Sequence, residues 1–476
     1  MTAAEKLAGL AGVLLFAAAG LGWLQLLAGA RSLPGSRGLA AAYLLGVGWV
    51  GGSLYALSHF GGVPLRRPAV LAVAVAPAVV GLLAWAHRRR AGPQVAPRRS
   101  RRRWSWLERA AFAIAIAVFV GVLAESLTNP LRDWDGRMTW VTQARYVRAE
   151  GTVDARALAE PQWYVTHPQY PLLLPLAQVA VQELAGVSDD VHAFRPFYAG
   201  FLFVFFALLY GFPRRRVGRS TAALTVMTAA LLPLPTFFPG GGAASGYSDL
   251  PLACFYAAGL LLLLTRRLRI ADGVAAGLLL AAAVLSKNEG TPLALAALFL
   301  GALAQLPARR GRPSGRWRRL APAGVAAVLV AMAIGLLVSW RSGIPNRYDE
   351  DYGHLLSLAA LWPAAVTRLP LLLPKIRFEM IAFQHWSLFW SVAPLVLLAG
   401  WRGLRRRGAA YLALAALAPL AVAWIAYSVN PDPTDIVRTS WNRFLLQASI
   451  PILILFSFAL DDLMRRSSWL PRDLTP

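Results

Sequence analysis

Cysteine and charged residues are scarce in this chain. Cys254 is the single cysteine among 476 residues, which excludes a disulfide framework or a cluster of thiolate metal ligands within one chain. Charged residues make up 15% of the chain, whereas about 25% is usual in soluble globular proteins. These shortages exclude a disulfide-stabilised secreted scaffold, a disordered tail protein and an ordinary cytosolic enzyme.

Apolar residues take the place of the missing charge. They make up 57% of the chain and gather in runs of roughly 15–25 residues, a length that crosses a bilayer core of about 30 Å. The sequence therefore predicts an all-α polytopic membrane protein with about thirteen transmembrane helices. The predicted helices occupy residues 7–30, 39–60, 68–86, 107–127, 194–212, 220–238, 249–265, 271–286, 291–306, 320–340, 386–400, 409–428 and 443–460.

Negative charge is also rare, since 23 acidic residues stand against 48 Lys and Arg, for a net charge of +25. In a soluble protein such a balance would indicate a nucleic-acid partner. No nucleic-acid-binding motif accompanies it here, and the arginines gather in short clusters between apolar runs, so we expect no nucleic-acid partner and interpret the clusters as topology signals. The clusters are Arg88–Arg90 with Arg98–Arg103, Arg214–Arg219, Arg266–Arg269, Arg309–Arg319, Arg402–Arg407 and Arg465–Arg466.

From residue 87 onward these clusters fall in alternate connections between the apolar runs. Positively charged loops are typically cytoplasmic, so the remaining loops are predicted to be extracytoplasmic. Three helices and an Arg-rich cytoplasmic loop then occupy residues 1–106, and a second transmembrane module occupies 107–476. The predicted outer loops are 128–193, 239–248, 287–290, 341–385 and 429–442.

The first helix has an alternative interpretation. Ala28-Gly29-Ala30 resembles a signal-peptidase site. Cleavage there would leave two helices before the Arg-rich loop and place that loop outside, against the charge rule. A retained first helix, with Met1 outside, is therefore favoured.

Two acidic residues open the first outer loop. Asp133 and Asp135 follow the helix that ends near Leu127, and residues 139–150, with Trp140 on the apolar face, are expected to form an amphipathic helix on the membrane surface. Two such carboxylates can hold a divalent cation, or one can act as a general base while the other positions it. Equally, one can cap the helix while the other is merely solvated.

Further polar residues follow in the outer loops. His167 and Tyr170 lie in a proline-rich approach to an apolar segment, where the histidine can ligate a metal, donate to a phosphate or form a structural hydrogen bond. The glycine-rich stretch 240–246 precedes Tyr247 and Asp249. Its glycines permit close approach of backbone to a ligand, or simply form a flexible hairpin, and Asp249 is expected in the first turn of a helix.

A short connection and the last loop supply more charge. Lys287, Asn288 and Glu289 lie between two very apolar helices, where the Lys and the Glu pair with each other or with a ligand. Lys287 suits a phosphate, or it is a snorkelling lysine. Arg438 and Arg443 can bind a phosphate bidentately or anchor a helix end.

All of these groups lie on one predicted side of the membrane, while the helices are nearly free of charge, with Glu125 near an outer end as a minor exception. A transporter would instead place polar groups near the midplane. The pattern favours an enzyme at the outer membrane–water boundary.

The order of these motifs resembles a family of integral-membrane enzymes. From roughly 107 to 460 the chain looks like the GT-C glycosyltransferases, specifically the bacterial family 39 relatives of protein O-mannosyltransferases and lipid A aminoarabinose transferases. The stretch Asp135–Arg145 is the most specific part, and Asn442–Gln447 resembles the entrance to the family's last helix. The resemblance implies a GT-C fold with an interfacial helix in the first outer loop, in a bacterial inner (cytoplasmic) membrane.

The resemblance also implies an activity, namely transfer of a sugar from a polyprenyl-phosphate donor to a glycan, lipid or protein acceptor on the outer face, with inversion of the anomeric centre. Asp135 matches the family's base or acceptor-positioning carboxylate, and Asp133 is an added neighbour. Charge on the phosphate would be stabilised by Lys287, Arg443 or a Mg²⁺ or Mn²⁺ ion, with the metal held by Asp133, Asp249 or Glu289. The chain lacks the adjacent Asp-Glu pair of the protein O-mannosyltransferases, and its three leading helices depart from the family pattern.

Two other functions remain open from the sequence. An O-antigen ligase or polymerase would use a diphosphate-linked donor and depend on basic residues of the late outer loop, here Arg347, His354, Lys375, Arg377 and His385. A flippase or transporter of lipid-linked sugars would move its substrate without forming a glycosidic bond.

Overall fold

The computed structural model describes residues 3–28, 36–90, 104–160, 162, 166–187, 191–265, 268–306, 314–345, 357–430 and 432–466. Within these ranges the chain forms helices and no strand, so the all-α class is confirmed. The first half contains α1 (Ala3–Ala28), α2 (Ser36–Gly61), α3 (Arg67–Arg90), α4 (Trp106–Thr128), η1 (Gly136–Val141), α5 (Thr142–Glu150), η2 (Arg156–Ala159), α6 (Leu173–Ala185), α7 (Val191–Phe194), α8 (Pro196–Gly211), η4 (Pro213–Arg215) and α9 (Arg219–Ala230). The second half contains α10 (Asp249–Leu263), α11 (Ile270–Ser286), α12 (Gly290–Gln305), α13 (Ser314–Arg341), α14 (Leu358–Ile381), α15 (Phe383–Trp386), α16 (Phe389–Ala399), η6 (Trp401–Arg405), α17 (Ala409–Val429) and α18 (Pro433–Arg466).

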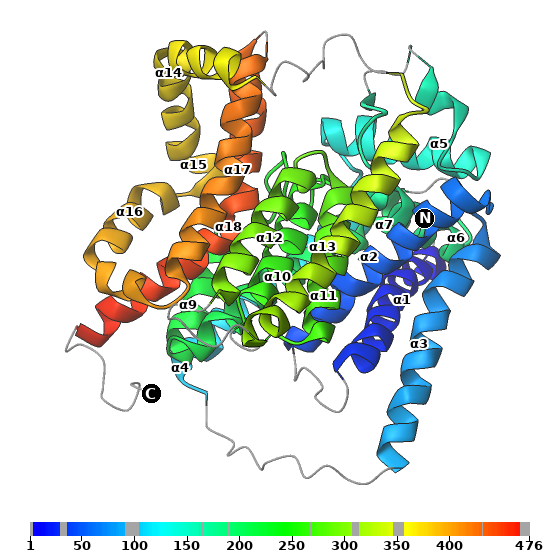
Figure 1. Ribbon diagram of the computed structural model, residues 1–476, viewed down its shortest axis with the longest axis horizontal. Coiled ribbons are helices and arrows are strands. Elements are labelled where there is room, and N and C mark those ends of the chain that lie inside the picture. The colour runs from blue at the N-terminus through cyan, green and yellow to red at the C-terminus, as the bar shows by residue number, and fades with distance from the viewer. Residues whose placement is uncertain are drawn as a thin grey trace.

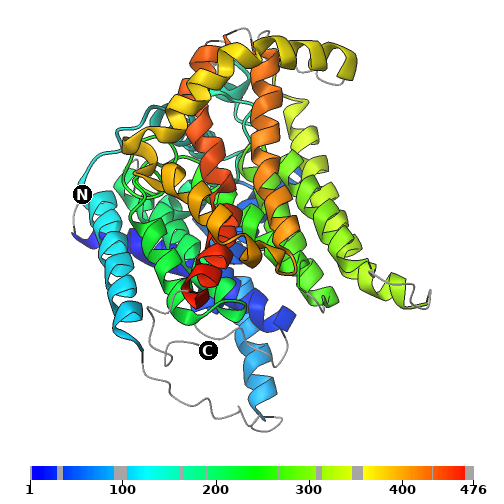
Figure 2. The same cartoon turned by 90° about the vertical axis from the view of Figure 1, so that its left-hand side faces the viewer.

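The connections gather at two opposite ends of a helical bundle (Figures 1 and 2). At one end, Arg406 donates to the carbonyl of Arg216 over 3.0 Å, and the Asp461 carboxylate accepts from the N–H of Gly218 over 3.0 Å. These bonds join two arginine-rich connections to the last turns of α18. We call this the arginine-rich end, and we call the opposite end, where α5 and α14 lie, the loop end.

The membrane character of the chain is clear from its long helices. Among the described residues, eight helices are long and apolar enough to span a membrane, as expected for a multi-pass membrane protein. They are 5–27, 38–61, 67–87, 106–128, 196–215, 319–341, 409–428 and 433–466.

Some of the predicted spans are shorter than expected, and the predicted number of thirteen is not confirmed. The run 220–238 forms a helix only as far as Ala230, because Pro233 and Pro235 follow and proline lacks the N–H that a continuing helix needs. The run 386–400 contains α16, of 11 residues. In addition, the buried helix α6 lies within the predicted first outer loop.

Glycines let the three N-terminal helices pack closely. A Cβ built on Gly46 of α2 would lie 1.7 Å from the carbonyl oxygen of Phe16 on α1, and one on Gly81 of α3 would lie 2.2 Å from the Cα of Gly22. Helix backbones approach this closely only where small residues face each other. On the other side of α2, the Tyr43 hydroxyl donates to the carbonyl of Phe197, the second residue of α8. The N-terminal helices therefore pack directly on the rest of the bundle.

Helix α4 leads into the acidic loop. It starts with a capping box, in which the Ser105 hydroxyl accepts from the Glu108 N–H and the Glu108 carboxylate accepts from the Ser105 N–H. At its other end, the Glu125 carboxylate pairs with Arg195 over 2.7 Å, and Arg195 also donates to the carbonyl of Ala244 over 3.0 Å. These contacts hold the end of α4, so the loop that carries Asp133 and Asp135 starts from a fixed position.

We expect Gly46→Ala to destabilise the protein, because the added methyl group overlaps the backbone of α1. Overpacking of this kind typically costs about 1–3 kcal/mol, so the melting temperature in detergent should fall. Gly335→Ala in α13 is the matched control, since a Cβ there meets nothing within 4 Å and alanine is the better helix former. Equal melting temperatures for the two variants would contradict the close crossing.

Candidate functional site at the loop end

A fully buried carboxylate forms the centre of the site. Asp249 is the first residue of α10 and is 0% exposed. Its Oδ1 accepts from Lys287 Nζ over 2.7 Å and from Gln447 Nε2 over 2.9 Å, and its Oδ2 accepts from Arg443 Nε over 2.9 Å. One carboxylate thus holds together α10, α18 and the connection after α11.

Arg443 connects this centre to the first-loop acid Asp135. Its Nη1 donates to Asp135 Oδ2 over 2.7 Å, and its guanidinium lies 5.0 Å from the centroid of the Tyr247 ring. The Tyr247 hydroxyl accepts from the backbone N–H of Asp135 over 3.2 Å. Burial raises the pKa of Tyr247, so its hydroxyl is neutral near pH 7. Guanidinium, carboxylate and phenol therefore fix one another.

Lys287 extends the charge cluster toward the next connection. Its Nζ donates to Glu289 Oε1 over 2.9 Å as well as to Asp249. The neighbouring Asn288 accepts a hydrogen bond from Arg341, whose Nε also donates to the carbonyl of Gln169 over 2.9 Å. Arg341 therefore brings the proline-rich loop beside the cluster.

Aromatic side chains line that proline-rich loop. The His167 ring is stacked on Tyr170, with centroids 5.0 Å apart, and Tyr170 lies 5.5 Å from Trp140. Gln143 of α5 donates to the carbonyl of His167 over 2.7 Å, which holds this residue at a φ of +49°. Tyr170 also interacts electrostatically with Arg443. Trp140 is buried beneath this loop, whereas His167 and Tyr170 are partly exposed.

Exposure increases from the centre of the cluster outward. The Asp249 and Lys287 side chains are 0% and 3% exposed, Arg443 is 13% exposed, and Asp135 reaches 27%. A ligand at the surface can therefore reach Asp135 and one edge of Arg443, while the buried partners stay fixed.

Asp133 lies in a different environment from Asp135. It is half-buried, and its charged neighbours include the Arg195–Glu125 pair. Burial is the main reason that its pKa is raised to about 6, with Arg195 opposing and Glu125 adding to the rise. Asp133 is therefore partly protonated in mildly acidic conditions.

The hydrogen bonds of the predicted metal ligands show which of their oxygens already have protein partners. In the part of the chain that the structure describes, no group of three His, Cys, Asp or Glu side chains could hold a metal ion. Both oxygens of Asp249 accept from Lys287, Gln447 or Arg443, and Glu289 accepts from Lys287. Both oxygens of Asp249 thus already accept from protein donors, which disfavours a divalent cation there, and the metal assignments to Glu289 and Asp133 stay predictions.

Some predicted residues lie away from the cluster. Arg438 is 69% exposed and pairs with Asp435 on the same helix over 2.8 Å. Of the late-loop residues, Lys375 and Arg377 are exposed on α14. His385 contacts Asn442 over 2.8 Å. Arg347 and His354 lie outside the described residues.

Three residues that hold the charge cluster or the loops beside it were not identified from the sequence. Gln447 lies one helical turn after Arg443, a spacing that puts both on one face of α18. Arg341 is the first residue of the predicted outer loop 341–385, directly after the predicted helix 320–340, and its charge at that position was the available signal. Arg195 lies just inside the predicted helix 194–212, beside the acidic loop only in the folded chain.

Comparison with models of known protein families, with curated proteins and with solved structures found no match to this chain.

We expect Arg443→Gln to destabilise the protein strongly, because it removes one of the two cations that compensate buried Asp249. Breaking a buried ion pair on one side typically costs about 3–5 kcal/mol. Thermal unfolding in detergent should show a clear fall in melting temperature. Arg438→Gln is the control on the same helix, with an expected change within about 0.5 kcal/mol, and similar losses in both variants would contradict the assignment.

Asp133 should make stability depend on pH. Its pKa rises from 3.8 to about 6 on folding, so the native state binds this proton more tightly than the unfolded chain. The stabilisation is complete below about pH 4 and is lost as the pH rises through about 6. Melting temperatures between pH 4 and 8 should therefore decline less for Asp133→Asn than for the wild type.

The control for this experiment is Asp435→Asn, whose carboxylate is 57% exposed and which should keep the wild-type pH dependence. An unchanged pH dependence in Asp133→Asn would contradict the raised pKa.

Proposed function

We propose that this protein is a membrane glycosyltransferase that transfers a sugar from a polyprenyl-phosphate donor to an acceptor hydroxyl at the loop end. The observation that carries the proposal is the chain of alternating charges Asp135–Arg443–Asp249–Lys287, which runs from the surface to a buried anchor. By the arginine asymmetry, the loop end is the extracytoplasmic face, and the family resemblance implies a bacterial inner membrane.

The donor phosphate binds at the exposed edge of Arg443, with Lys287 behind it. Asp249 fixes both cations before any ligand arrives, and such preorganised charges stabilise an anion without a reorganisation cost. Arginine has five N–H donors, and its two bonds to Asp249 and Asp135 leave donors for a phosphate. The lipid chain of the donor remains in the membrane beside the site.

Phosphate binding also changes the hydrogen-bond partner of the Asp135 carboxylate. In the structure this carboxylate pairs with Arg443 Nη1. A phosphate first bound by the remaining donors competes with Asp135 for Nη1 and so releases this carboxylate toward the acceptor hydroxyl. The charge cluster therefore couples donor binding to exposure of the catalytic carboxylate.

The chemical step is a direct displacement. The acceptor oxygen attacks the anomeric carbon, its proton passes to Asp135, and the bond between the anomeric carbon and the phosphate oxygen breaks. The leaving polyprenyl phosphate keeps the bonding electron pair, and Arg443 and Lys287 stabilise its added negative charge. One displacement of this kind inverts the anomeric centre.

The aromatic residues support sugar binding. Tyr170 and His167 are partly exposed and their rings are stacked on each other, and aromatic faces of this type pack against the apolar face of a sugar. Trp140 and Gln143 hold these rings in place from the buried side. Glycan, lipid and protein acceptors all offer the hydroxyl that this step requires.

Asp135→Asn should abolish transfer while leaving expression and folding intact, because the carboxamide can neither take the proton nor replace the carboxylate charge. Purified protein in lipid vesicles would be incubated with radiolabelled polyprenyl-monophosphate sugars, with and without EDTA. The expected loss is at least about 100-fold, the range of general acid–base catalysis. Asp435→Asn, an exposed carboxylate at the same end, is the control and should retain activity.

Other outcomes would point elsewhere. Full activity of Asp135→Asn would overturn the assignment of the catalytic carboxylate. Turnover of diphosphate-linked donors alone would favour the ligase or polymerase, and movement of the labelled lipid without a new glycosidic bond would favour a flippase. Loss of transfer in EDTA would establish a divalent ion, with Asp133 as the ligand to test first.

A further inference from the structure

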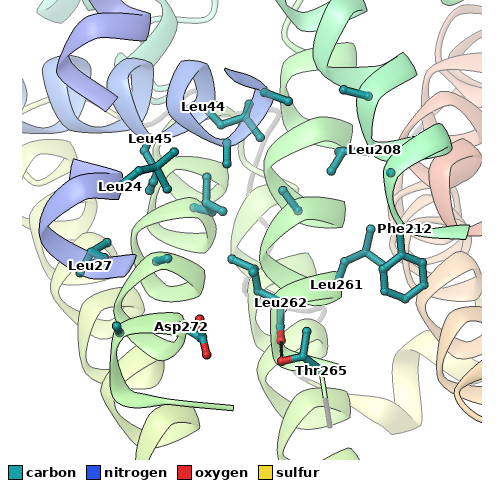
Figure 3. A pocket seen from close by; sticks show the side chains of 18 of the residues that line it. Leu24, Leu27, Leu44, Leu45, Leu208, Phe212, Leu261, Leu262, Thr265 and Asp272 are labelled. Atoms are coloured by element: carbon teal, nitrogen blue, oxygen red, sulfur yellow. Dashed lines mark hydrogen bonds between the residues drawn. The ribbon is translucent and has the colours of Figure 1, made fainter. Parts of the chain in front are cut away.

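A cavity of about 530 Å³ lies near the arginine-rich end, away from the charge cluster. Leu24 of α1 and Leu45 of α2 line one side, and Leu208 of α8 and Leu262 of α10 line the other (Figure 3). Its volume falls within the range of about 300–1,000 Å³ that is common for ligand pockets. The cavity separates the N-terminal helices from the second module.

This cavity is distinct from the proposed catalytic site. Helix α10 passes both, with Asp249 at its first residue and Leu262 near its last. At 1.5 Å per residue, these two positions are about 20 Å apart along the helix. A ligand of the cavity therefore does not touch Asp135 or Arg443.

The lining is apolar along its length and charged at one end. Leucine and alanine side chains from α1, α2, α8, α10 and α11 form the walls, and Arg215, Arg269 and Asp272 join the lining where these helices meet the arginine-rich connections. In Figure 3, Asp272 and Thr265 lie at the same end of the cavity. An apolar tail and an anionic head match this distribution.

The charged end has an excess of positive charge. Arg269 is paired with Asp272 over 3.3 Å, so the second cation, Arg215, carries the net charge. Arg215 is exposed at the end of η4, where it can meet a ligand. Leu27 and Phe212 are only partly buried in the wall, so the cavity is accessible from the surface of the bundle.

We propose that this cavity binds an anionic glycerophospholipid of the cytoplasmic leaflet. One acyl chain occupies the leucine-lined interior, and the phosphate lies against Arg215 and Arg269. Basic pockets between transmembrane helices on the cytoplasmic side bind anionic lipid headgroups in this way. The lipid fills the space between the N-terminal helices and the rest of the bundle. Its binding does not depend on the proposed sugar transfer.

Native mass spectrometry of the detergent-purified protein would test this site, with phosphatidylglycerol and phosphatidylcholine added separately. We expect one phosphatidylglycerol to be retained more tightly than phosphatidylcholine. Arg215→Gln should weaken phosphatidylglycerol binding about fivefold, the contribution typical of one basic side chain near an anionic lipid. Arg402→Gln, exposed at the same end and outside the lining, is the control and should bind as the wild type does.

A second variant blocks the cavity near its charged end. Ala271 lines it and is partly exposed, so Ala271→Trp can fill it without entering the packed core. This variant should lose phosphatidylglycerol while it keeps the wild-type melting temperature in lipid-free detergent.

Four results would overturn the proposal. The first three, which concern phospholipid binding alone, are equal retention of the two phospholipids, equal binding by Arg215→Gln and Arg402→Gln, and undiminished binding by Ala271→Trp. The fourth is displacement of phosphatidylglycerol by an equal concentration of polyprenyl phosphate, because the occupant would then be a polyprenyl lipid.

Discussion

The ion pair between Asp249 and Arg443 is the interaction on which the loop end depends. Removing two charges from water is costly, and a buried pair often contributes little net stability. What this pair provides is position, because Lys287 and Gln447 share the same carboxylate and Asp135 shares the same guanidinium. Four segments far apart in the chain therefore meet at defined distances.

Close backbone packing has the complementary role in the N-terminal helices. There the contacts depend on the absence of side chains at Gly20, Gly46 and Gly81, and few charges are involved. Tyr43 then connects α2 to the backbone of α8. The same helices form one wall of the leucine-lined cavity, so they touch the rest of the bundle along part of their length and are separated from it by a fillable space elsewhere.

The helical class and the two-ended arrangement could be predicted from the sequence, because apolar runs and arginine clusters are local signals. The helix predicted over 220–238 ends early, at Ala230, because a prediction from hydrophobicity alone ignores the helix-ending effect of Pro233 and Pro235. Helix α6 was missed because its 13 residues are too few for a span.

For the site, the sequence predicted which residues share one end of the bundle, and Asp135, Lys287, Asp249 and Arg443 do meet there. It could not indicate their pairing, because Asp249 and Arg443 are 194 residues apart and their contact depends on how α10 packs against α18. For the same reason, Arg438 was grouped with Arg443 although the helix turns it toward solvent and Asp435.

Helix α18 carries ionic contacts near both of its ends. Arg443 is fixed to Asp249 at the loop end, and Asp461 is fixed to Arg406 and Gly218 at the arginine-rich end. The 18 residues between Arg443 and Asp461 span about 27 Å, close to the hydrocarbon thickness of an ordinary bilayer, about 30 Å. If α18 crosses the lipid layer along this stretch, the two groups of charges lie at its two boundaries. A bilayer several ångströms thicker would draw one of them into hydrocarbon or deform around the bundle, so membrane thickness becomes a condition for the geometry of the charge cluster.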